Sequence, residues 1–163
     1  MSDSGPRWHI HAATLDDVNG LVALEERCFD YSRMGARSFR RLLTGTSAHI
    51  YVCKNESCEL AGYYLLLTRK NSLRWRLYSI AIAPEARGTG LGRMLLEHSI
   101  HTAQKHGAIS LGLEVKVDNN TAIRLYEKLN FAVIDLLPGY YDDGTDGYRM
   151  RVSFTNATNQ ESR

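Results

Sequence analysis

The feature that most constrains the fold of this chain is residues 78–96, where an apolar run stops at Pro84, passes three spaced glycines and resumes with helical periodicity. This pattern predicts a strand, a loop and a helix in succession. Gly88, Gly90 and Gly92 allow sharp turns and close approach to a ligand, because they have no Cβ. The first turn of the following helix has unpaired amides and a positive dipole end, which favour an anion. The segment therefore predicts a phosphate or pyrophosphate ligand.

The residues around this loop narrow the choice of phosphate ligand. A P-loop requires a Lys-Ser/Thr pair after its last glycine, whereas Arg93-Met94 follows Gly92 here. A dinucleotide fingerprint requires an acidic residue about 20 residues further on. Glu114 lies 22 residues after Gly92, so spacing alone leaves a dinucleotide site open. The loop, however, begins with Arg87 and lies in mid-chain after several predicted strands.

Length and composition indicate one domain and give few signs of a charged or lipid partner. A chain of 163 residues with 44% hydrophobic content can bury one core. The net charge of +2 implies neither a nucleic-acid nor a membrane partner. No apolar run approaches the roughly 20 residues of a membrane span, and the first six residues lack a signal-peptide core. With three cysteines, an odd number that suits a reducing compartment, the chain is expected to be cytoplasmic.

The periodicity along the chain predicts a mixed α/β protein with the order βααββ(β)αβαββ. Strands are expected at 8–12, 48–54, 60–68, 74–83, 109–115, from 131 and at 148–154, and helices after Thr14, at 36–43, at 90–106 and after Asn119. The strand, glycine loop, helix and next strand predict a right-handed βαβ unit with parallel strands. We expect residues 1–7 to be a flexible leader, 8–154 a single domain and 155–163 a disordered tail.

The glycine loop resembles that of a known family. Arg87-Gly88-Thr89-Gly90-Leu91-Gly92 is similar to the Arg/Gln-x-x-Gly-x-Gly/Ala acetyl-CoA loop of the GCN5-related N-acetyltransferases, the GNAT superfamily. This resemblance implies acetyl-CoA as cofactor. It also implies the GNAT fold, a mixed and largely antiparallel central sheet with a parallel βαβ acetyl-CoA unit and helices on both faces.

Two residues are candidates for the proton transfers that acetylation of an amine requires. Glu114 lies in an otherwise apolar strand beside the βαβ crevice, and a carboxyl group in an apolar setting has a raised pKa, which suits a general base. Tyr126 follows 12 residues later, and a phenol held beside a departing thiolate can protonate it. The residues alone leave two structural alternatives open: Glu114 as partner of an arginine, and Tyr126 as a core aromatic with its hydroxyl at the edge.

A longer segment strengthens the resemblance. Residues 113–131 are similar to the signature of the RimI-type protein N-terminal alanine acetyltransferases, Leu-Glu-Val-Arg-x-x-Asn-x-x-Ala-Ile-x-Leu-Tyr-Glu-x-Leu-Gly-Phe. The resemblance implies that Glu114 is the proton acceptor and Tyr126 the proton donor beside the cofactor. It also implies that Asn119 contacts the cofactor.

The resemblance assigns further binding residues. Backbone groups of the strand would meet the acetyl and pantetheine arm, and the loop would hold the pyrophosphate. These residues are Ile80, Ala81 and Ile82 of the strand, and Arg87, Gly88, Thr89, Gly90, Leu91, Gly92 and Arg93 of the loop. The acceptor is expected to contact Phe29, Tyr31, Tyr140 and Tyr141.

The segment after Cys28-Phe29 departs from the family pattern. Asp30-Tyr31-Ser32 stands where Pro-Trp-Ser/Thr is frequent. The stretch 27–43 is closer to RimI-like domains joined to a C39-type peptidase domain. A ribosomal substrate is therefore not implied.

The sequence hypothesis is an acetyl-CoA-dependent N-acetyltransferase that acts on the N-terminal α-amine of a protein or peptide. An α-amine has a pKa of about 7.7 to 8.0, well below that of lysine, so a modest base can deprotonate it. A small-amine acetyltransferase, acting on a polyamine, aminoglycoside or amino acid, and a non-catalytic acyl-CoA-binding domain remain alternatives. Asp142, Asp143 and Asp146 either attract a cationic acceptor or belong to a tight turn. No metal site is expected, and we expect a monomer or weak homodimer.

Overall fold

The computed structural model describes residues 8–29 and 34–154. The predicted leader at 1–7, the predicted tail at 155–163 and Tyr31 lie outside these residues. Contacts within the chain define two compact units. The first unit comprises Met1–Leu67 and Ser79–Ser99, and the second comprises Thr68–Tyr78 and Ile100–Arg163.

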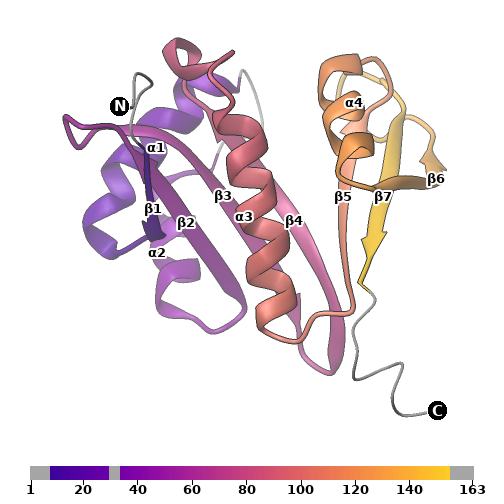
Figure 1. The fold of residues 1–163 in the computed structure, drawn as a ribbon, viewed down its shortest axis with the longest axis horizontal. Coiled ribbons are helices and arrows are strands. Elements are labelled where there is room, and N and C mark those ends of the chain that lie inside the picture. Colours follow the sequence, from indigo (N-terminus) through magenta and orange to yellow (C-terminus); the bar gives the residue numbers. More distant parts are fainter. Residues whose placement is uncertain (1–7, 30–33, 155–163) are drawn as a thin grey trace, which may run out of the picture. The chain divides into compact units, whose positions relative to one another are not determined.

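The predicted order of helices and strands is confirmed (Figure 1). The helices are α1 (Val18–Cys28), α2 (Ala36–Thr44), α3 (Leu91–Lys105) and α4 (Asn120–Lys128). The strands are β1 (His9–Ala12), β2 (Ala48–Lys54), β3 (Leu60–Arg69), β4 (Ser72–Ile82), β5 (Ser110–Lys116), β6 (Ala132–Leu137) and β7 (Gly147–Ser153). Short 3-10 helices at Leu15–Asp17 and Pro84–Ala86 precede α1 and the glycine loop.

The strands form a seven-stranded sheet in the order β1-β2-β3-β4-β5-β7-β6. The predicted parallel pairing is confirmed for β4 and β5, whose register joins Arg74–Arg76 to Ser110–Gly112. β4 runs on to Ile82 and β5 to Lys116 beyond this short ladder. The pairs β1·β2, β2·β3, β5·β7 and β6·β7 are antiparallel. The mixed, mostly antiparallel α/β sheet is therefore confirmed.

In the first unit, α1 and α2 close one face of the sheet. Thr14 caps the turn before α1 in a capping box with Asp17, so the helix begins where the sequence predicts it. Leu21 and Leu24 of α1 and Phe39 of α2 are almost fully buried in one apolar cluster with residues of β2 and β3. This burial at helical spacing explains why these amphipathic segments fold onto the sheet.

Strand β3 is buried on both of its faces. Tyr63 and Leu65 belong to the cluster under α1 and α2. Tyr64, on the opposite face, bonds through its hydroxyl to Nδ1 of His98 on α3 at 2.6 Å. Because successive side chains of a strand alternate between faces, α3 covers the face opposite α1 and α2. The predicted helices on both faces are thus confirmed within this unit.

In the second unit, β5 has an apolar face and a polar face. Leu111, Leu113 and Val115 are buried, and the alternate residues Gly112, Glu114 and Lys116 project to the other face. The apolar face continues into β4 with Trp75, whose ring lies 5.7 Å from that of His106. The polar face of β5 is where the candidate base lies.

No helix among the residues that the structure describes has the length and apolar character needed to cross a lipid bilayer.

Gly62 of β3 lies where any larger residue would overpack the first unit. A Cβ there would stand 2.8 Å from Leu95 Cδ1 and 3.0 Å from the carbonyl oxygen of Ala81. We expect Gly62→Ala to lower the free energy of unfolding by about 2 kcal/mol, since neither neighbour is free to yield. That loss corresponds to a melting temperature about 4–8 °C lower for a chain of this size. Urea unfolding and thermal melts measure both quantities.

The matched control is Gly112→Ala in β5, where the nearest atom to the new Cβ is the Met150 carbonyl oxygen at 3.5 Å. This is ordinary van der Waals contact, so its stability should change by less than about 0.5 kcal/mol. Equal stabilities for the two variants would contradict close packing at Gly62.

Candidate active site

The glycine loop has the backbone that its sequence predicts. Gly88 and Gly90 have φ of 80° and 89°, in the left-handed region that favours glycine. No atom lies within 4 Å of a Cβ built on either residue, so the space beside the loop is open. Helix α3 begins at Leu91, immediately after the loop. The amides of its first turn are suited to a phosphate group.

Side chains brace the ends of this loop. The Thr89 hydroxyl donates to the Ala86 carbonyl at 2.5 Å, and Nε of Arg87 donates to the Ile82 carbonyl at 3.1 Å. Arg93 forms an i,i+4 pair with Glu97 at 3.1 Å. Both guanidinium groups are exposed, so they are suited to reach a polyanion.

One backbone acceptor at the end of the strand before the loop is already engaged. The Ile82 carbonyl accepts from Arg87 and also from the Cys28 thiol at 3.3 Å. Ala81 is buried, and Ile80 and Ile82 are half-buried. Contacts of this strand with an acetyl or pantetheine arm stay a prediction.

Glu114 lies between two arginines. Its Oε1 accepts from Nη2 and Nε of Arg76 at 2.7 and 2.9 Å, and its Oε2 accepts from Nε of Arg149 at 3.3 Å. Only 11% of the Glu114 side chain is exposed, while those of Arg76 and Arg149 are 43% and 39% exposed. A second carboxylate, Asp135 of β6, lies 3.9 Å from Nη1 of Arg149.

The prediction of an apolar setting for Glu114 is therefore wrong. The neighbours of Glu114 along β5 are apolar, but their side chains point to the opposite face of the sheet. The register of β5 with β7 places Arg149 directly opposite Glu114, and β4 supplies Arg76. The sequence left Glu114 open as a general base or as the partner of an arginine. The pairing with arginine describes the surroundings of Glu114, and its role as a base stays a prediction.

Asn119 and Tyr126 are positioned by α4. Asn119 caps the helix, its side-chain oxygen accepting from the Ala122 amide at 3.3 Å, which leaves its side-chain NH₂ as a donor. Tyr126 is 9% exposed, and its ring lies 5.7 Å from that of Phe131. Burial raises the pKa of Tyr126 to about 12, because a phenolate is poorly solvated there. The phenol thus keeps its proton throughout the neutral range.

The predicted acceptor residues lie in different parts of the chain. Phe29 ends α1 in the first unit, where its amide donates to the Glu25 carbonyl at 2.9 Å. Tyr140 and Tyr141 belong to the second unit and pack edge to face with centroids 5.0 Å apart. Lys116 Nζ lies 5.4 Å from the centroid of the Tyr141 ring.

The acidic loop after these tyrosines is held by its own hydrogen bonds. Asp143 accepts from the Thr145 amide and from Lys116 Nζ, both at 3.0 Å. Hydrogen bonds from Thr145 and Lys116 lower the pKa of the Asp143 carboxyl to about 2. Asp146 accepts from the Gly139 amide at 2.8 Å. These contacts support the turn interpretation of the loop for Asp143 and Asp146.

The two units therefore each contain part of the predicted set. In the first unit are Phe29, Ile80, Ala81, Ile82 and residues 87–93; in the second are Glu114, Asn119, Tyr126, Tyr140 and Tyr141. Sequence reasoning missed Arg76 and Arg149 as partners of Glu114. The sequence feature that indicates them is the alternation of basic and apolar residues in β4 and β7, which places the basic residues on one face of the sheet.

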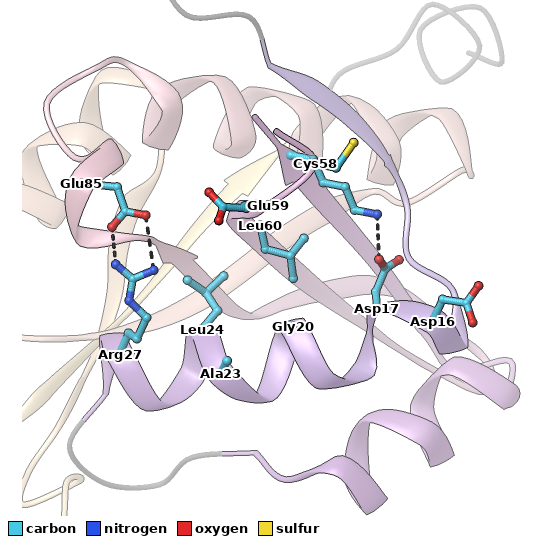
Figure 2. A pocket seen from close by; sticks show the side chains of 11 residues that line it. Asp16, Asp17, Gly20, Ala23, Leu24, Arg27, Cys58, Glu59, Leu60 and Glu85 are labelled. Atoms are coloured by element: carbon cyan, nitrogen blue, oxygen red, sulfur yellow. Dashed lines mark hydrogen bonds and ion pairs between the residues drawn. The ribbon is translucent and has the colours of Figure 1, made fainter. Parts of the chain in front are cut away.

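A pocket of about 430 Å³ in the first unit is lined by other residues (Figure 2). Leu24 and Leu60 form its middle, and ion pairs stand at its two ends. Arg27 pairs with Glu85 at one end, and Lys54 pairs with Asp17 at 3.0 Å at the other. Of the four carboxylates in its lining, Asp17 and Glu85 are therefore already paired.

Comparisons with known proteins bear on the family and agree with the fold. A family model described as acetyltransferase (GNAT) family matches residues 18–131. An uncharacterized protein of Mycobacterium leprae is 36% identical over 146 residues, which cover 87% of this chain and 40% of that protein. The [ribosomal protein bS18]-alanine N-acetyltransferase of Escherichia coli is 45% identical over 71 residues, 44% of this chain and 47% of the enzyme.

Two further similarities concern a related activity and a solved structure. An N-alpha-acetyltransferase of Saccharolobus solfataricus is 47% identical over 73 residues, 44% of each chain. The crystal structure of the ribosomal-protein-S18-alanine N-acetyltransferase from Escherichia coli has a TM-score of 0.83 at 27% identity, covering 93% of this chain and 96% of that one. By sequence, this chain spans about half the length, or less, of these curated relatives.

The buried phenol of Tyr126 can be detected by its titration. We expect the difference between the ultraviolet titrations of the wild type and Tyr126→Phe to have its midpoint near pH 12, whereas an ordinary tyrosine titrates near pH 10. Because the folded pKa is the higher one, Tyr126 contributes stability below pH 10 that is lost as the pH rises toward 12. A difference curve centred near pH 10 would show a solvated hydroxyl instead.

Proposed function

Because the chain belongs to the acetyltransferase (GNAT) family, we propose that it transfers the acetyl group of acetyl-CoA to the N-terminal α-amine of a protein or peptide. The single observation that carries the choice of acceptor is the 45% identity over 71 residues to a ribosomal-protein alanine N-acetyltransferase. The similarity to an N-alpha-acetyltransferase of a second organism supports the same acceptor class.

The residues of the glycine loop fit the cofactor. Open space at Gly88 and Gly90, the first turn of α3, and the exposed guanidinium groups of Arg87 and Arg93 suit a pyrophosphate. Thr89, Leu91 and Gly92 complete this loop, and Asn119 supplies a side-chain donor. When bound, acetyl-CoA supplies an acetyl thioester, whose carbonyl carbon is the electrophile.

Glu114 is the proposed general base. As the amine nitrogen bonds to the acetyl carbon, a carboxylate oxygen of Glu114 takes the proton that the nitrogen loses, directly or through one water. Arg76 and Arg149 hold that carboxylate in one orientation, so the proton acceptor is positioned before the amine arrives.

Tyr126 is the proposed proton donor. Its phenol would donate a hydrogen bond or its proton to the thioester sulfur, which takes the electron pair of the carbon–sulfur bond when that bond breaks. A phenol with a pKa of about 12 is a weak acid toward a thiolate, so it acts by sharing its proton as charge develops on sulfur. Its high pKa also ensures that the proton is present at every physiological pH.

A backbone change in the glycine loop tests the cofactor site. Alanine at position 90 must adopt φ near 89°, which costs about 1 kcal/mol and moves the loop amides. We expect Gly90→Ala to weaken acetyl-CoA binding about five- to tenfold in isothermal titration calorimetry. The control is Gly144→Ala, which is also at positive φ (86°) but lies in the acidic loop of the second unit. Equal cofactor affinities in both variants would contradict the proposed loop.

Glu114→Gln tests the chemistry. We expect kcat for acetylation of N-terminal peptides, measured as CoA release, to fall at least about tenfold, because the amide cannot accept the proton. The affinity for the cofactor should change little. Glu127→Gln is the matched control, since it removes an exposed carboxylate one residue from Tyr126 on the same helix. Peptides starting with Ala or Ser, free polyamines and peptides with lysine as the only amine form the acceptor panel.

The panel separates the alternative functions. Turnover of polyamines or amino acids in preference to peptides would identify a small-amine acetyltransferase. Cofactor binding without turnover of any acceptor would identify an acyl-CoA-binding domain.

A further inference from the structure

The polar face of the sheet in the second unit contains more than Glu114. Paired residues of neighbouring strands project to the same face. The registers of β4, β5 and β7 place Arg76, Gly112 and Arg151 in one row across the three strands. The next row contains Glu114 and Arg149, and the preceding row begins with Arg74.

This surface, called here the cationic face, consists of Arg74, Arg76, Lys116, Arg149 and Arg151. Among the residues that the structure describes, the carboxylates of Glu114 and Asp135 share this face, and Asp143 reaches Lys116 from the loop. Among the described residues, neither Arg74 nor Arg151 forms an ion pair, whereas the other three cations do. Arg74 is exposed and Arg151 is half-buried. The face therefore keeps a positive surplus that is accessible to a partner.

The middle of the cationic face has room for a ligand. Gly112 separates Arg76 from Arg151 in this row, and no side chain of the described residues lies within 4 Å of a Cβ built on it. Strands lie about 4.8 Å apart, so the Cα atoms of Arg76 and Arg151 are roughly 10 Å from each other. Arg76 is engaged with Glu114, whereas the guanidinium group of Arg151 forms no ion pair among the described residues and can bind a carboxylate placed above the glycine.

We infer that the acceptor is a peptide N-terminus followed by acidic side chains, which bind the cationic face while the α-amine lies at Glu114. The inference rests on the proposed function and adds the class of acceptor sequence to it. Its basis is charge complementarity, because cations that have no partner within the described chain stand on the same sheet face as the proposed base.

The spacing of the rows indicates which positions of the acceptor matter. Alternate residues of a strand are about 7 Å apart, so the row of Arg151 lies roughly 7 Å from Glu114 and that of Arg74 roughly 14 Å. An extended peptide advances about 3.4 Å per residue. Acidic side chains at about positions 3 to 5 of the acceptor would therefore meet these arginines.

The test compares peptides that share one first residue and carry Asp, Asn or Lys at positions 2 to 5. We expect kcat/KM to be about tenfold higher for the Asp peptide than for the Asn peptide, and lowest for the Lys peptide. A difference of this size corresponds to two or three partly exposed charge pairs between the Asp side chains and the arginines. The difference should appear in KM, because these contacts form equally in the ground state and the transition state. Added salt should reduce it.

Arg74→Ala and Arg151→Ala are the informative variants, because neither residue holds Glu114. Each should reduce the preference for Asp over Asn by several-fold, and Arg151→Glu should reverse it in favour of Lys. Lys105→Ala, which removes an exposed cation at the end of α3, is the matched control and should leave the preference unchanged. Equal kcat/KM for Asp and Asn peptides, or a preference that persists in both Ala variants, would overturn the inference.

A binding arm separates this inference from the proposed function. If no peptide is acetylated, fluorescence anisotropy measures the affinity of the same labelled peptides for the protein. Tighter binding of the Asp peptide that is lost in Arg151→Ala would support the inference even though the enzyme proposal had failed. A short single-stranded RNA that binds through the same arginines more tightly than the Asp peptide would overturn it in favour of a nucleic acid.

Discussion

The hydrogen bond between the Tyr63 hydroxyl and the Glu25 carboxylate, at 2.5 Å, is the interaction on which the first unit depends. Both groups are buried, and a buried carboxylate without partners is strongly destabilising. The other Glu25 oxygen accepts from the Met34 amide at 2.9 Å, and Tyr63 also reaches Ser79 at 3.0 Å. One polar cluster thus joins α1, the approach to α2, β3 and β4, and it holds α1 against the strand that leads to the glycine loop.

Much of the fold follows from local sequence signals. The Thr14 cap, the helical spacing in α1 and α3, and Asn119 at the start of α4 each act within a few residues, so a single stretch predicts them. The parallel pairing of β4 and β5 also follows, because a strand, helix and strand in succession leave few other arrangements. The register of β5 with β7 does not follow, since it is set by packing between segments 35 residues apart.

The candidate site divides in the same way. Features set by the local sequence could be predicted, whereas features set by contacts between distant segments could not. The glycine loop is a backbone property, and positive φ at Gly88 and Gly90 is what glycine at those positions indicates. The surroundings of Glu114 depend instead on how three strands, β4, β5 and β7, are paired. The sequence of β5 shows apolar neighbours, yet alternation sends them to the opposite face and leaves Glu114 facing residues 38 and 35 positions away. The pocket at Leu24 and Leu60 was not predicted, because its lining comes from three distant segments.

The arginines around Glu114 also bear on which amine reacts. A protonated amine that approaches Glu114 must come close to Arg76 and Arg149, and like charges in a partly desolvated site disfavour it. The proposed reaction needs a neutral amine, and an α-amine with a pKa of about 7.7 to 8.0 is neutral in a substantial minority of molecules near physiological pH. A lysine side chain or a polyamine would arrive charged, since its amines have pKa values near 10. In the proposed reaction, Arg76 and Arg149 would therefore disfavour multiply charged acceptors through the same guanidinium groups that orient the proposed base.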